Sequence, residues 1–505
     1  MLLWYTKMYL WKECPFRKVN TFWEETTMEI KAGTAVKPSE LELARQLEYI
    51  RMIREKNDAF EQANGRKKKF YSLAMGCQMN AHDSEKLEGM LFEMGFEPTD
   101  VEKEADFIIY NTCCVRENAE LKVYGKLGWL KHYKEVKNPD AIIALCGCMM
   151  QQETVLQTLR QKYRHVDIVF GTFNLYKLPE LVATRMESDR TVYDIWQEHQ
   201  EVVEDLPIIR HFPYKASVNI MFGCNNFCSY CIVPYVRGRE RSRTPEDIIA
   251  EVRKLAADGV KEVMLLGQNV NSYGKNLDNP VSFAELLRMV NEVEGIERIR
   301  FMTSHPKDLS DELIKAMAEC DKVCKYLHLP VQSGSSEILR RMNRHYTKES
   351  YMEIVRKARE AMPGITLSTD IIVGFPGETE EDFQQTLDVI REARYSTAFT
   401  FIYSKRTGTP AAVMENQVPE DVVSDRFNRM LDVLNPIVHE VHEEQVGKVM
   451  TVFAEEVSKQ NSSILTGRAD NNMLVHFPGT EDMIGQMIPV KIIDNKTFYL
   501  IGERI

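Results

Sequence analysis

Three cysteines in one short loop carry the clearest chemistry of this 505-residue chain. Cys224, Cys228 and Cys231 stand at positions i, i+4 and i+7, directly after a strand-like run at 216–221. Thiolates are soft ligands for iron–sulfur clusters and zinc, so three this close must share a centre or form disulfides. A four-iron cluster held by three thiolates leaves one iron open for a substrate, whereas a structural zinc ion needs a fourth ligand, for which only His211 is near. The spacing therefore favours an iron–sulfur cluster.

The aromatic Tyr230 before the last of these cysteines completes a CxxxCxΦC pattern, which resembles that of radical S-adenosylmethionine (SAM) enzymes. The resemblance implies a [4Fe-4S] cluster on the three thiolates, with SAM at its open iron. Besides Tyr230, amide and hydroxyl groups at later strand ends are expected to contact SAM: Gln268, Asn269, Gln332 and Ser333.

A basic run follows the cysteine loop closely and could bind RNA phosphates or the SAM carboxylate. A solvated loop is the alternative, since Glu240 interrupts the run. We expect RNA binding from its four arginines: Arg237, Arg239, Arg241 and Arg243.

Two other strand-end loops favour structural roles. His305 is expected to be a loop histidine satisfied by backbone, and Glu378 or Thr379 to cap the helix that follows. No catalytic side chain is therefore assigned beyond the cluster cysteines.

A second group of cysteines is dispersed in the sequence, yet its members follow three successive strand-like segments. Because parallel strands bring their carboxyl ends to one edge of a sheet, a second three-thiolate site is expected there. Buried structural cysteines are the alternative. Cys146 and Cys148 are predicted to point the same way along their strand, whereas neighbouring residues of a strand diverge, so spacing alone leaves the ligands open. The candidates are Cys77, Cys113, Cys114, Cys146 and Cys148.

The elements that must position these residues alternate along most of the chain. Strand and helix signals from 70 to about 185 predict a doubly wound parallel-sheet domain. Six further strand–helix units from 216 onward, then a helix at 421–445, predict a partial (β/α)6 barrel. Five short strand signals in 446–505 predict a small antiparallel β-barrel. The fold class is α/β, divided into a leader at 1–66 and domains at 67–190, 210–444 and 445–505.

The leader is the least informative part. An amphipathic helix is predicted at 39–62, and Met28 is a possible true start.

Composition excludes several classes of protein. A hydrophobic content of 44% and a charged content of 28% are typical of a soluble globular protein, and no apolar run approaches the length of a membrane span. Eleven cysteines without a signal peptide argue against a secreted disulfide scaffold and favour a reducing cytoplasm. The net charge of −11 gives no general indication of nucleic-acid binding, so RNA would be met by local basic patches.

From about residue 67 onward the chain resembles the radical-SAM methylthiotransferases, whose N-terminal cluster domain, radical-SAM barrel and TRAM domain occur in this order. The segments 76–80 (GCQMN) and 111–119 (NTCCVRENA) resemble the tRNA-modifying branch called MiaB. The third auxiliary cysteine of that family lies in a stretch like Gly147-Cys148-Met149. The resemblance thus implies that Cys77, Cys113 and Cys148 hold an auxiliary [4Fe-4S] cluster, with Cys114 and Cys146 as extra thiols.

The resemblance also implies a reaction. SAM cleaved at the first cluster yields a radical that takes hydrogen from C2 of N6-isopentenyladenosine at position 37 of tRNA. A sulfur on the auxiliary cluster, methylated by a second SAM, then joins C2. The implied partners are the tRNA anticodon stem-loop, an electron donor such as flavodoxin or ferredoxin, and a sulfur source. The enzyme is expected to be a cytoplasmic monomer.

Two alternatives remain open from the sequence. One is the same chemistry on another substrate, either threonylcarbamoyl-adenosine in tRNA or an aspartate of a ribosomal protein. The other is a non-catalytic iron–sulfur protein that binds RNA or senses redox state.

Overall fold

The computed structural model describes residues 33–505 except 115–116, 189, 198–200 and 205. Most of the leader, including Met28 and Cys14, lies outside the described residues. None of the helices in the described part of the chain is long and apolar enough to cross a bilayer.

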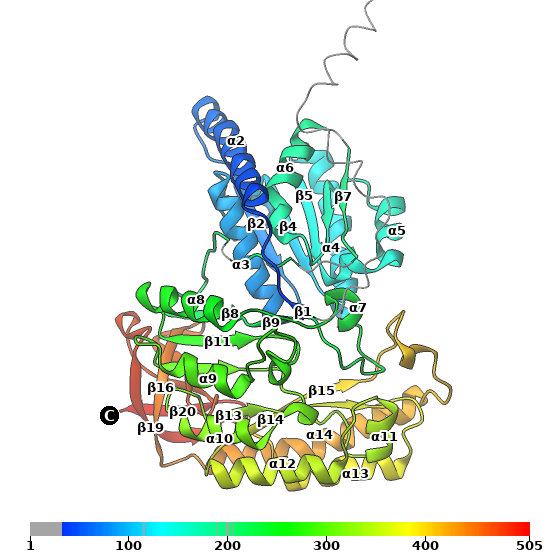
Figure 1. The fold of residues 1–505 in the computed structure, drawn as a ribbon, viewed down its shortest axis with the longest axis vertical. Coiled ribbons are helices and arrows are strands. Elements are labelled where there is room, and N and C mark those ends of the chain that lie inside the picture. The colour runs from blue at the N-terminus through cyan, green and yellow to red at the C-terminus, as the bar shows by residue number, and fades with distance from the viewer. Residues whose placement is uncertain (1–32, 115–116, 189, 198–200, 205) are drawn as a thin grey trace, which may run out of the picture. The chain divides into compact units, whose positions relative to one another are not determined.

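One six-stranded parallel sheet forms the N-terminal domain (Figure 1). Along the chain, β2 (Lys69–Ala74) is followed by β3 (Glu97–Pro98) on one side of it and then by β4 (Phe107–Thr112) on the other. The direction of winding therefore reverses between β2 and β4, which is the switch point of the sheet. The predicted doubly wound sheet is confirmed, although its short outer strand Glu97–Pro98 was not predicted. The strand order is β3 (Glu97–Pro98), β2 (Lys69–Ala74), β4 (Phe107–Thr112), β5 (Ile142–Gly147), β6 (Ile168–Phe170) and β7 (Val192–Asp194).

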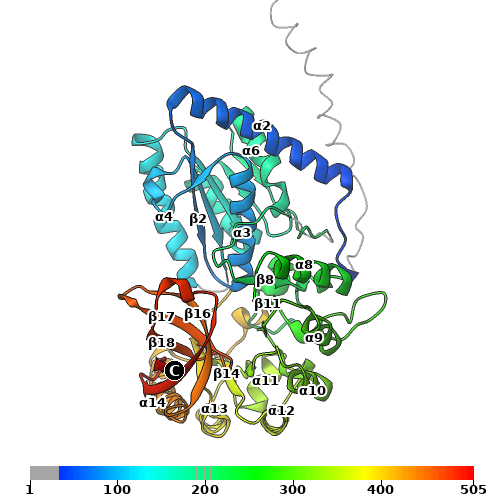
Figure 2. The same ribbon diagram turned by 90° about the vertical axis from the view of Figure 1, so that its left-hand side faces the viewer.

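Alternation along the strands divides the core between the two faces of this sheet. In β4, Ile108 and Tyr110 pack against α4 (Glu117–Val136) and α5 (Glu153–Lys162). Phe107 and Ile109 point the other way, toward α3 (Gln78–Glu93) and α6 (Leu178–Glu187), which Figure 2 shows beside the sheet. Every strand residue of β4 is buried, as expected for a parallel strand covered on both faces.

The predicted leader helix is α2 (Glu40–Asn64), capped by the hydroxyl of Ser39. Its first half is less buried than an amphipathic helix predicts, because Leu41 and Leu47 are 81% and 62% exposed, whereas Ile53 lies in the core of the N-terminal domain. Polar contacts add to this packing: Gln46 Nε2 donates to Glu180 Oε2 at 3.1 Å, and Asn57 Nδ2 to the Met94 carbonyl at 2.9 Å.

The central domain contains six parallel strands in two three-stranded sheets, which confirms the partial barrel. The predicted first strand is divided into β8 (Lys215–Asn219) and the short β9 (Met221–Phe222). The strand β9 pairs with β10 (Arg241–Ser242), which in turn pairs with β1 (Gly33–Thr34). The orders are β12 (Arg298–Phe301), β11 (Glu262–Leu266), β8 (Lys215–Asn219), and β13 (Tyr326–His328), β14 (Thr366–Val373), β15 (Thr397–Ile402).

The main helices of this barrel begin at serine or threonine caps, whose hydroxyl oxygens accept a backbone N–H of the first turn. These helices are α8 (Pro245–Ala257), α9 (Phe283–Asn291), α10 (Asp311–Glu319), α12 (Lys348–Ala361) and α13 (Glu380–Ala393). The long helix α14 (Glu420–Glu443) then leads to the C-terminal domain.

The C-terminal domain is the predicted five-stranded barrel, closed in the structure (Figure 2). One pair departs from the expected antiparallel pattern, because β18 and β20 are parallel. Arg298 of β12 anchors the barrel by donating to the carbonyls of Arg468 and Thr451, each at 2.7 Å. The strand order is β16 (Val449–Ser458), β17 (Asn461–Ala469), β18 (Leu474–Pro478), β20 (Leu500–Arg504) and β19 (Met487–Asn495).

Candidate metal centres

The proposed cluster cysteines lie in two groups, each at the carboxyl end of parallel strands. Among the described residues, no three His, Cys, Asp or Glu side chains surround the position of a single ion. A cluster of several irons, each bound by one thiolate, spreads its ligands over a larger volume, and both groups are purely thiol donors. The local triplet is Cys224, Cys228 and Cys231; the dispersed triplet is Cys77, Cys113 and Cys148.

Backbone contacts fold the loop of the local triplet. A Cβ on Gly223, whose φ is +75°, would lie 2.0 Å from the carbonyl oxygen of Arg239, so only glycine fits. The N–H of Cys224 donates to the Gly238 carbonyl at 3.1 Å, and Phe227 takes a φ of +46°. The loop is thereby folded back onto the chain that follows it.

The thiols of the local triplet share one electrostatic environment. Burial raises the pKa of Cys224 and that of Cys231 to about 12, and the charge of Cys228 contributes to both shifts. Thiolates therefore form here only when a positive charge compensates them, which bound iron would supply.

One buried guanidinium contacts this triplet. Nη1 of Arg344 donates to Cys228 Sγ at 3.5 Å, while Nη2 donates to the Pro330 carbonyl at 2.9 Å and Nε to the Tyr346 hydroxyl at 3.0 Å. Its hydrogen-bond partners are thus a thiol, a carbonyl and a phenol rather than a carboxylate.

Asn80, in the first turn of α3, forms hydrogen bonds to the strand ends that precede the cysteines of the dispersed triplet. Its Nδ2 donates to the carbonyls of Met75 and Thr112, each at 2.9 Å. Its Oδ1 lies 3.8 Å from Cys77 Sγ and 3.9 Å from Cys148 Sγ. One side chain thus contacts segments that are far apart in the sequence.

Two glycines allow the thiols to approach. A Cβ on Gly76, at φ +105°, would lie 2.5 Å from Cys113 Cβ. A Cβ on Gly147, at φ +93°, would lie 2.4 Å from the carbonyl oxygen of Thr112. Both positions combine a left-handed backbone with a close approach, which only glycine permits.

The turn at Gly147 also separates Cys146 from Cys148. Cys146 packs in the core facing α3 and α6, whereas Cys148 packs in the core facing α4 and α5. The prediction that these two side chains point the same way is therefore wrong, because the positive φ ends the strand alternation. Cys114 lies near the dispersed triplet, and burial, with the charges of Cys148 and Cys113, raises its pKa well above the usual value.

The basic run behind the cysteine loop is mostly buried, which corrects the prediction that it binds RNA at the surface. Arg237, Arg241 and Arg243 are 6%, 5% and 7% exposed. Arg243 pairs with Glu251 at 2.6 Å, and the guanidinium of Arg241 lies over aromatic rings. Of the four arginines only Arg239 is exposed.

Arg237 instead belongs to the dispersed triplet. It ends the short helix α7 (Val233–Arg237), and its Nη2 donates to Asn80 Oδ1 at 2.6 Å and to Asp83 Oδ2 at 2.9 Å. Its charge and hydrogen bonding also act on Cys148, although burial dominates and raises the pKa of that thiol to about 11. Sequence reasoning missed this contact, because the partners are more than 150 residues apart.

The two triplets are joined by apolar packing. Met79, just after Cys77, packs with Phe222 and Leu266 of the barrel. Ile232 and Val236, which follow the cysteine loop, lie in the core of the N-terminal sheet. The loop that carries the local triplet is therefore held by the domain that carries the dispersed one.

The residues predicted to contact SAM differ in whether their polar atoms already have hydrogen-bond partners within the protein. Gln268 Oε1 and Asn269 Oδ1 are buried without a hydrogen-bond partner, so both can accept from a ligand. Ser333 is fully buried, and its hydroxyl oxygen accepts from the N–H of Ser335 at 3.2 Å, so it serves the loop. Gln332 has a φ of +66°, and Tyr230 packs against the small apolar cluster that includes Phe375.

Three further groups on neighbouring loops also lack partners: Asn271 Oδ1, Ser304 Oγ and His305 Nε2. The expectation that backbone satisfies His305 holds for one nitrogen, since Nδ1 accepts from the Lys307 N–H at 3.2 Å. Burial lowers the pKa of His305 to about 2, so the ring is neutral and Nε2 carries the proton. Five unpaired polar atoms at one end of the barrel are the sign of a polar ligand site. For Asn271, Ser304 and His305, a position at the end of a strand was the only signal in the sequence.

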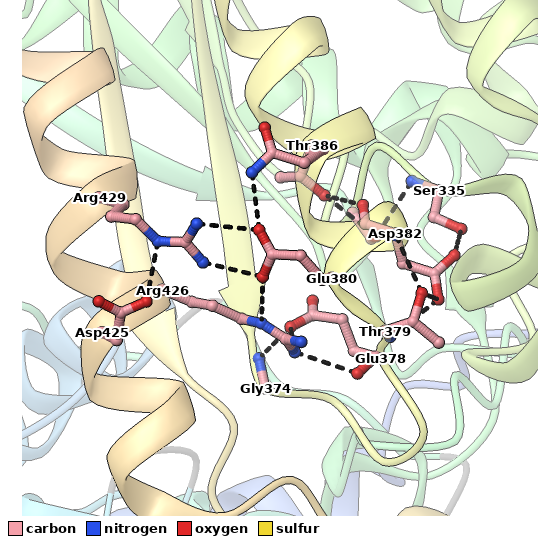
Figure 3. A network of polar contacts seen from close by, with 12 residues as sticks. Ser335, Gly374, Glu378, Thr379, Glu380, Asp382, Thr386, Asp425, Arg426 and Arg429 are labelled. Carbon is pink, nitrogen blue, oxygen red and sulfur yellow. Dashed lines mark hydrogen bonds and ion pairs between the residues drawn. The ribbon is translucent and has the colours of Figure 1, made fainter.

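The loop after β14 has the structural role that was expected (Figure 3). Thr379 caps α13 in a capping box with Asp382. Glu378 Oε2 accepts from the Gly374 N–H at 2.9 Å and from Arg426 Nη1 at 3.1 Å, which fastens the loop to α14.

Comparison with family models divides the chain into three matched regions. Residues 69–171 match the Uncharacterized protein family UPF0004, residues 218–390 the Radical SAM superfamily, and residues 443–505 the TRAM domain. The matched regions correspond to the N-terminal sheet, the partial barrel and the closed barrel.

Several curated relatives carry the name tRNA-2-methylthio-N(6)-dimethylallyladenosine synthase. One from Clostridioides difficile is 58% identical over 461 residues, covering 91% of this chain and 96% of the relative. One from Lachnoclostridium phytofermentans is 57% identical (87% and 96% covered), and one from Acetivibrio thermocellus 56% identical (92% and 96%). Because 461 of the 505 residues are aligned in the first, the similarity extends into the first 66 residues.

Among solved structures, the radical S-adenosylmethionine methyltransferase TsrM from Kitasatospora setae, with cobalamin and a [4Fe-4S] cluster bound, has a TM-score of 0.50 at 16% identity. The match covers 68% of this chain and 77% of that chain. At this identity the likeness concerns the fold alone.

Proposed function

We propose that this chain, which belongs to the tRNA-2-methylthio-N(6)-dimethylallyladenosine synthase family of radical SAM enzymes, adds a methylthio group to C2 of N6-isopentenyladenosine at position 37 of tRNA. It uses two molecules of SAM. The observation that carries this proposal is the presence of two three-thiol groups at the carboxyl ends of two parallel sheets, joined by shared packing.

The donor sets fit [4Fe-4S] clusters. Each consists of three thiols with a buried guanidinium nearby, and neither includes a carboxylate or imidazole. The local triplet would hold the cluster that binds SAM, and the dispersed triplet the auxiliary cluster. When bound, these groups and SAM supply the hydrogen abstraction and the sulfur.

The chain's own residues provide binding, orientation and exclusion of water. Gln268 and Asn269 present unpaired carbonyl oxygens that suit the amino group of SAM. The neutral His305 presents an Nε2–H without a partner, which can donate to SAM or to the target nucleotide. Met79, Phe222 and Leu266 form an apolar contact between the domain of the dispersed triplet and the barrel.

The tRNA is presented through its anticodon loop, whose unstacked bases can be turned out of the loop. Arg239 is the arginine of the basic run that is exposed to meet it, and its guanidinium lies 4.3 Å from the ring centroid of Phe227. The TRAM domain, matched at 443–505, supports an RNA substrate.

The remaining requirements follow from the chemistry. The bound clusters would require a low-potential electron donor, such as flavodoxin or ferredoxin, and a separate source of sulfur. The enzyme acts as a monomer in the cytoplasm, with the chain divided as expected from the sequence except that β7 extends the N-terminal domain to Asp194.

An isotope experiment tests the proposal. The reconstituted enzyme is incubated with SAM, a reductant and an isopentenylated anticodon stem-loop deuterated at C2 of the target adenosine. Deuterium is expected in 5′-deoxyadenosine together with a methylthio product. Turnover without transfer of deuterium would contradict the mechanism.

A matched RNA separates the alternatives. An otherwise identical stem-loop with threonylcarbamoyl-adenosine should give no methylthio product. Product from that RNA would change the substrate, and absence of 5′-deoxyadenosine from every incubation would favour a non-catalytic iron–sulfur protein.

A further inference from the structure

Each thiol triplet is accompanied by one buried arginine that the reaction described above does not use. Arg237 and Arg344 are 6% and 5% exposed, and they come from different parts of the barrel domain. Arg237 lies six positions after Cys231, yet it contacts the surroundings of the dispersed triplet and not those of the local one. Arg344 follows α11 (Ser336–Arg341) and contacts the local triplet.

The position of Arg237 is fixed from two sides. Nη2 donates to Asn80 Oδ1 at 2.6 Å, and the same oxygen lies 3.8 Å from Cys77 Sγ and 3.9 Å from Cys148 Sγ. The guanidinium and two of the three thiols therefore contact the same oxygen atom. Asp83 holds the same nitrogen at 2.9 Å and is 3% exposed, so its negative charge is as buried as the cation.

Arg344 is held without a carboxylate. Its Nη1 donates directly to Cys228 Sγ at 3.5 Å, and its other hydrogen bonds go to the Pro330 carbonyl and the Tyr346 hydroxyl. The two sites thus share a buried cation but differ in its counter-charge: Asp83 pairs with Arg237, whereas the hydrogen bonds of Arg344 go to no carboxylate among the described residues.

A cluster gains one negative charge when it is reduced. In a poorly solvated interior a fixed cation favours the more negative state, and hydrogen bonds to ligand sulfurs act in the same direction. We propose that Arg237 and Arg344 are positioning residues that separately set the reduction potentials of the auxiliary and the SAM-binding cluster, with Asp83 moderating the first. This inference rests on the ligand assignment of the proposed function.

A crossed experiment tests the proposal. Changing all three cysteines of the local triplet to alanine leaves the dispersed site alone, and changing the dispersed triplet leaves the local site alone. After anaerobic reconstitution, the midpoint potential of the single remaining cluster is measured by redox titration with EPR detection.

In the protein that keeps the dispersed site, Arg237→Gln is expected to lower the potential by at least 59 mV, which is a tenfold change for a one-electron couple. Arg344→Gln is the matched control and should leave this potential unchanged. In the protein that keeps the local site, Arg344→Gln should lower the potential and Arg237→Gln should leave it unchanged.

Two further variants separate charge from structure. Arg237→Lys keeps the cation and should retain most of the potential of the unchanged protein. Asp83→Asn removes the counter-charge and should raise the potential of the dispersed site, opposite in sign to Arg237→Gln. A purely structural role predicts shifts that do not follow the charge.

The outcomes are distinguishable from failure of the proposed function. If a triple-alanine protein binds no iron and sulfide at the remaining triplet, the ligand assignment is wrong. If it binds a cluster whose potential is the same with Arg237→Gln and Asp83→Asn, or changes with the wrong sign, the inference about the arginines is overturned. Equal shifts from both arginines in one protein would also overturn it.

Discussion

The two thiol triplets reach similar donor sets by opposite routes. The local triplet is contained in eight residues and depends on a loop with left-handed positions at Gly223 and Phe227. The dispersed triplet spans residues 77–148 and depends on the order of strands in a sheet, with Asn80 and Gly76 closing the arrangement. The local site therefore depends on a short sequence motif, whereas the dispersed site depends on the fold of the whole N-terminal domain.

The two sites are therefore expected to lose their structure under different conditions. Damage to the N-terminal sheet should abolish the dispersed site first, while the local loop keeps its own backbone contacts. The separation is incomplete, because Ile232 and Val236 embed the chain after the loop in the core of that sheet. The predictions below test how far the two sites are independent.

The largest effects are expected from the ligands themselves. Cys228→Ala should abolish both cleavage of SAM and formation of the methylthio product. Cys148→Ala should abolish the product, yet leave SAM cleavage and roughly half of the iron and sulfide, since one of two clusters remains. Chromatography of 5′-deoxyadenosine and of digested tRNA measures both. Loss of SAM cleavage in Cys148→Ala would show that the sites are not independent.

A smaller but still severe effect is expected from Gly76→Ala. A left-handed φ costs about 1–3 kcal/mol, and overpacking against Cys113 adds roughly 1–3 kcal/mol. Urea denaturation followed by tryptophan fluorescence checks this, because Trp129 and Trp196 lie in the N-terminal domain. The matched control is Gly125→Ala in α4, where a Cβ meets nothing within 4 Å and helix propensity predicts a gain of up to about 1 kcal/mol.

Asn80→Ala should have an intermediate effect. It leaves the half-buried carbonyl of Met75 and the buried carbonyl of Thr112 without this donor, at a cost of about 1–3 kcal/mol in the free energy of unfolding. Asn64→Ala, which removes an exposed amide at the end of α2, should change stability by less than about 0.5 kcal/mol. Iron bound at the local triplet should be unaffected by either change; a loss there would contradict the comparison.

The smallest effect concerns access to the free thiols. Cys77 is exposed, whereas Cys113 and Cys148 of the same triplet are buried. Iodoacetamide should therefore modify Cys77 of the metal-free protein before the other cluster cysteines, as followed by peptide mass spectrometry. Faster modification of Cys113 would mean that the sheet edge opens without its cluster.

The sequence predicted these two sites unequally. Spacing alone identified the local triplet, because its geometry is a loop. The dispersed triplet needed a predicted topology, and spacing left Cys146 and Cys148 as equal candidates, because no periodicity reveals the φ of Gly147 that separates their side chains.

The buried arginines were beyond sequence reasoning. A charge run is ordinarily a solvated face, and the run at 237–243 gave no sign that Asp83 and Asn80, more than 150 residues earlier, would accept Arg237. The closed C-terminal barrel was predictable in number of strands, but the parallel pairing of β18 with β20 depends on the connection between them.

The placement of Ile232 and Val236 also bears on synthesis at the ribosome. The N-terminal sheet is complete in sequence by Asp194, but these two side chains belong to its core. At about 5–20 residues per second, the stretch from Asp194 to Val236 takes roughly 2–8 s to emerge. During that interval the nascent domain exposes the apolar surface that α7 will cover, which makes it a natural client for a chaperone that binds chains in the course of translation.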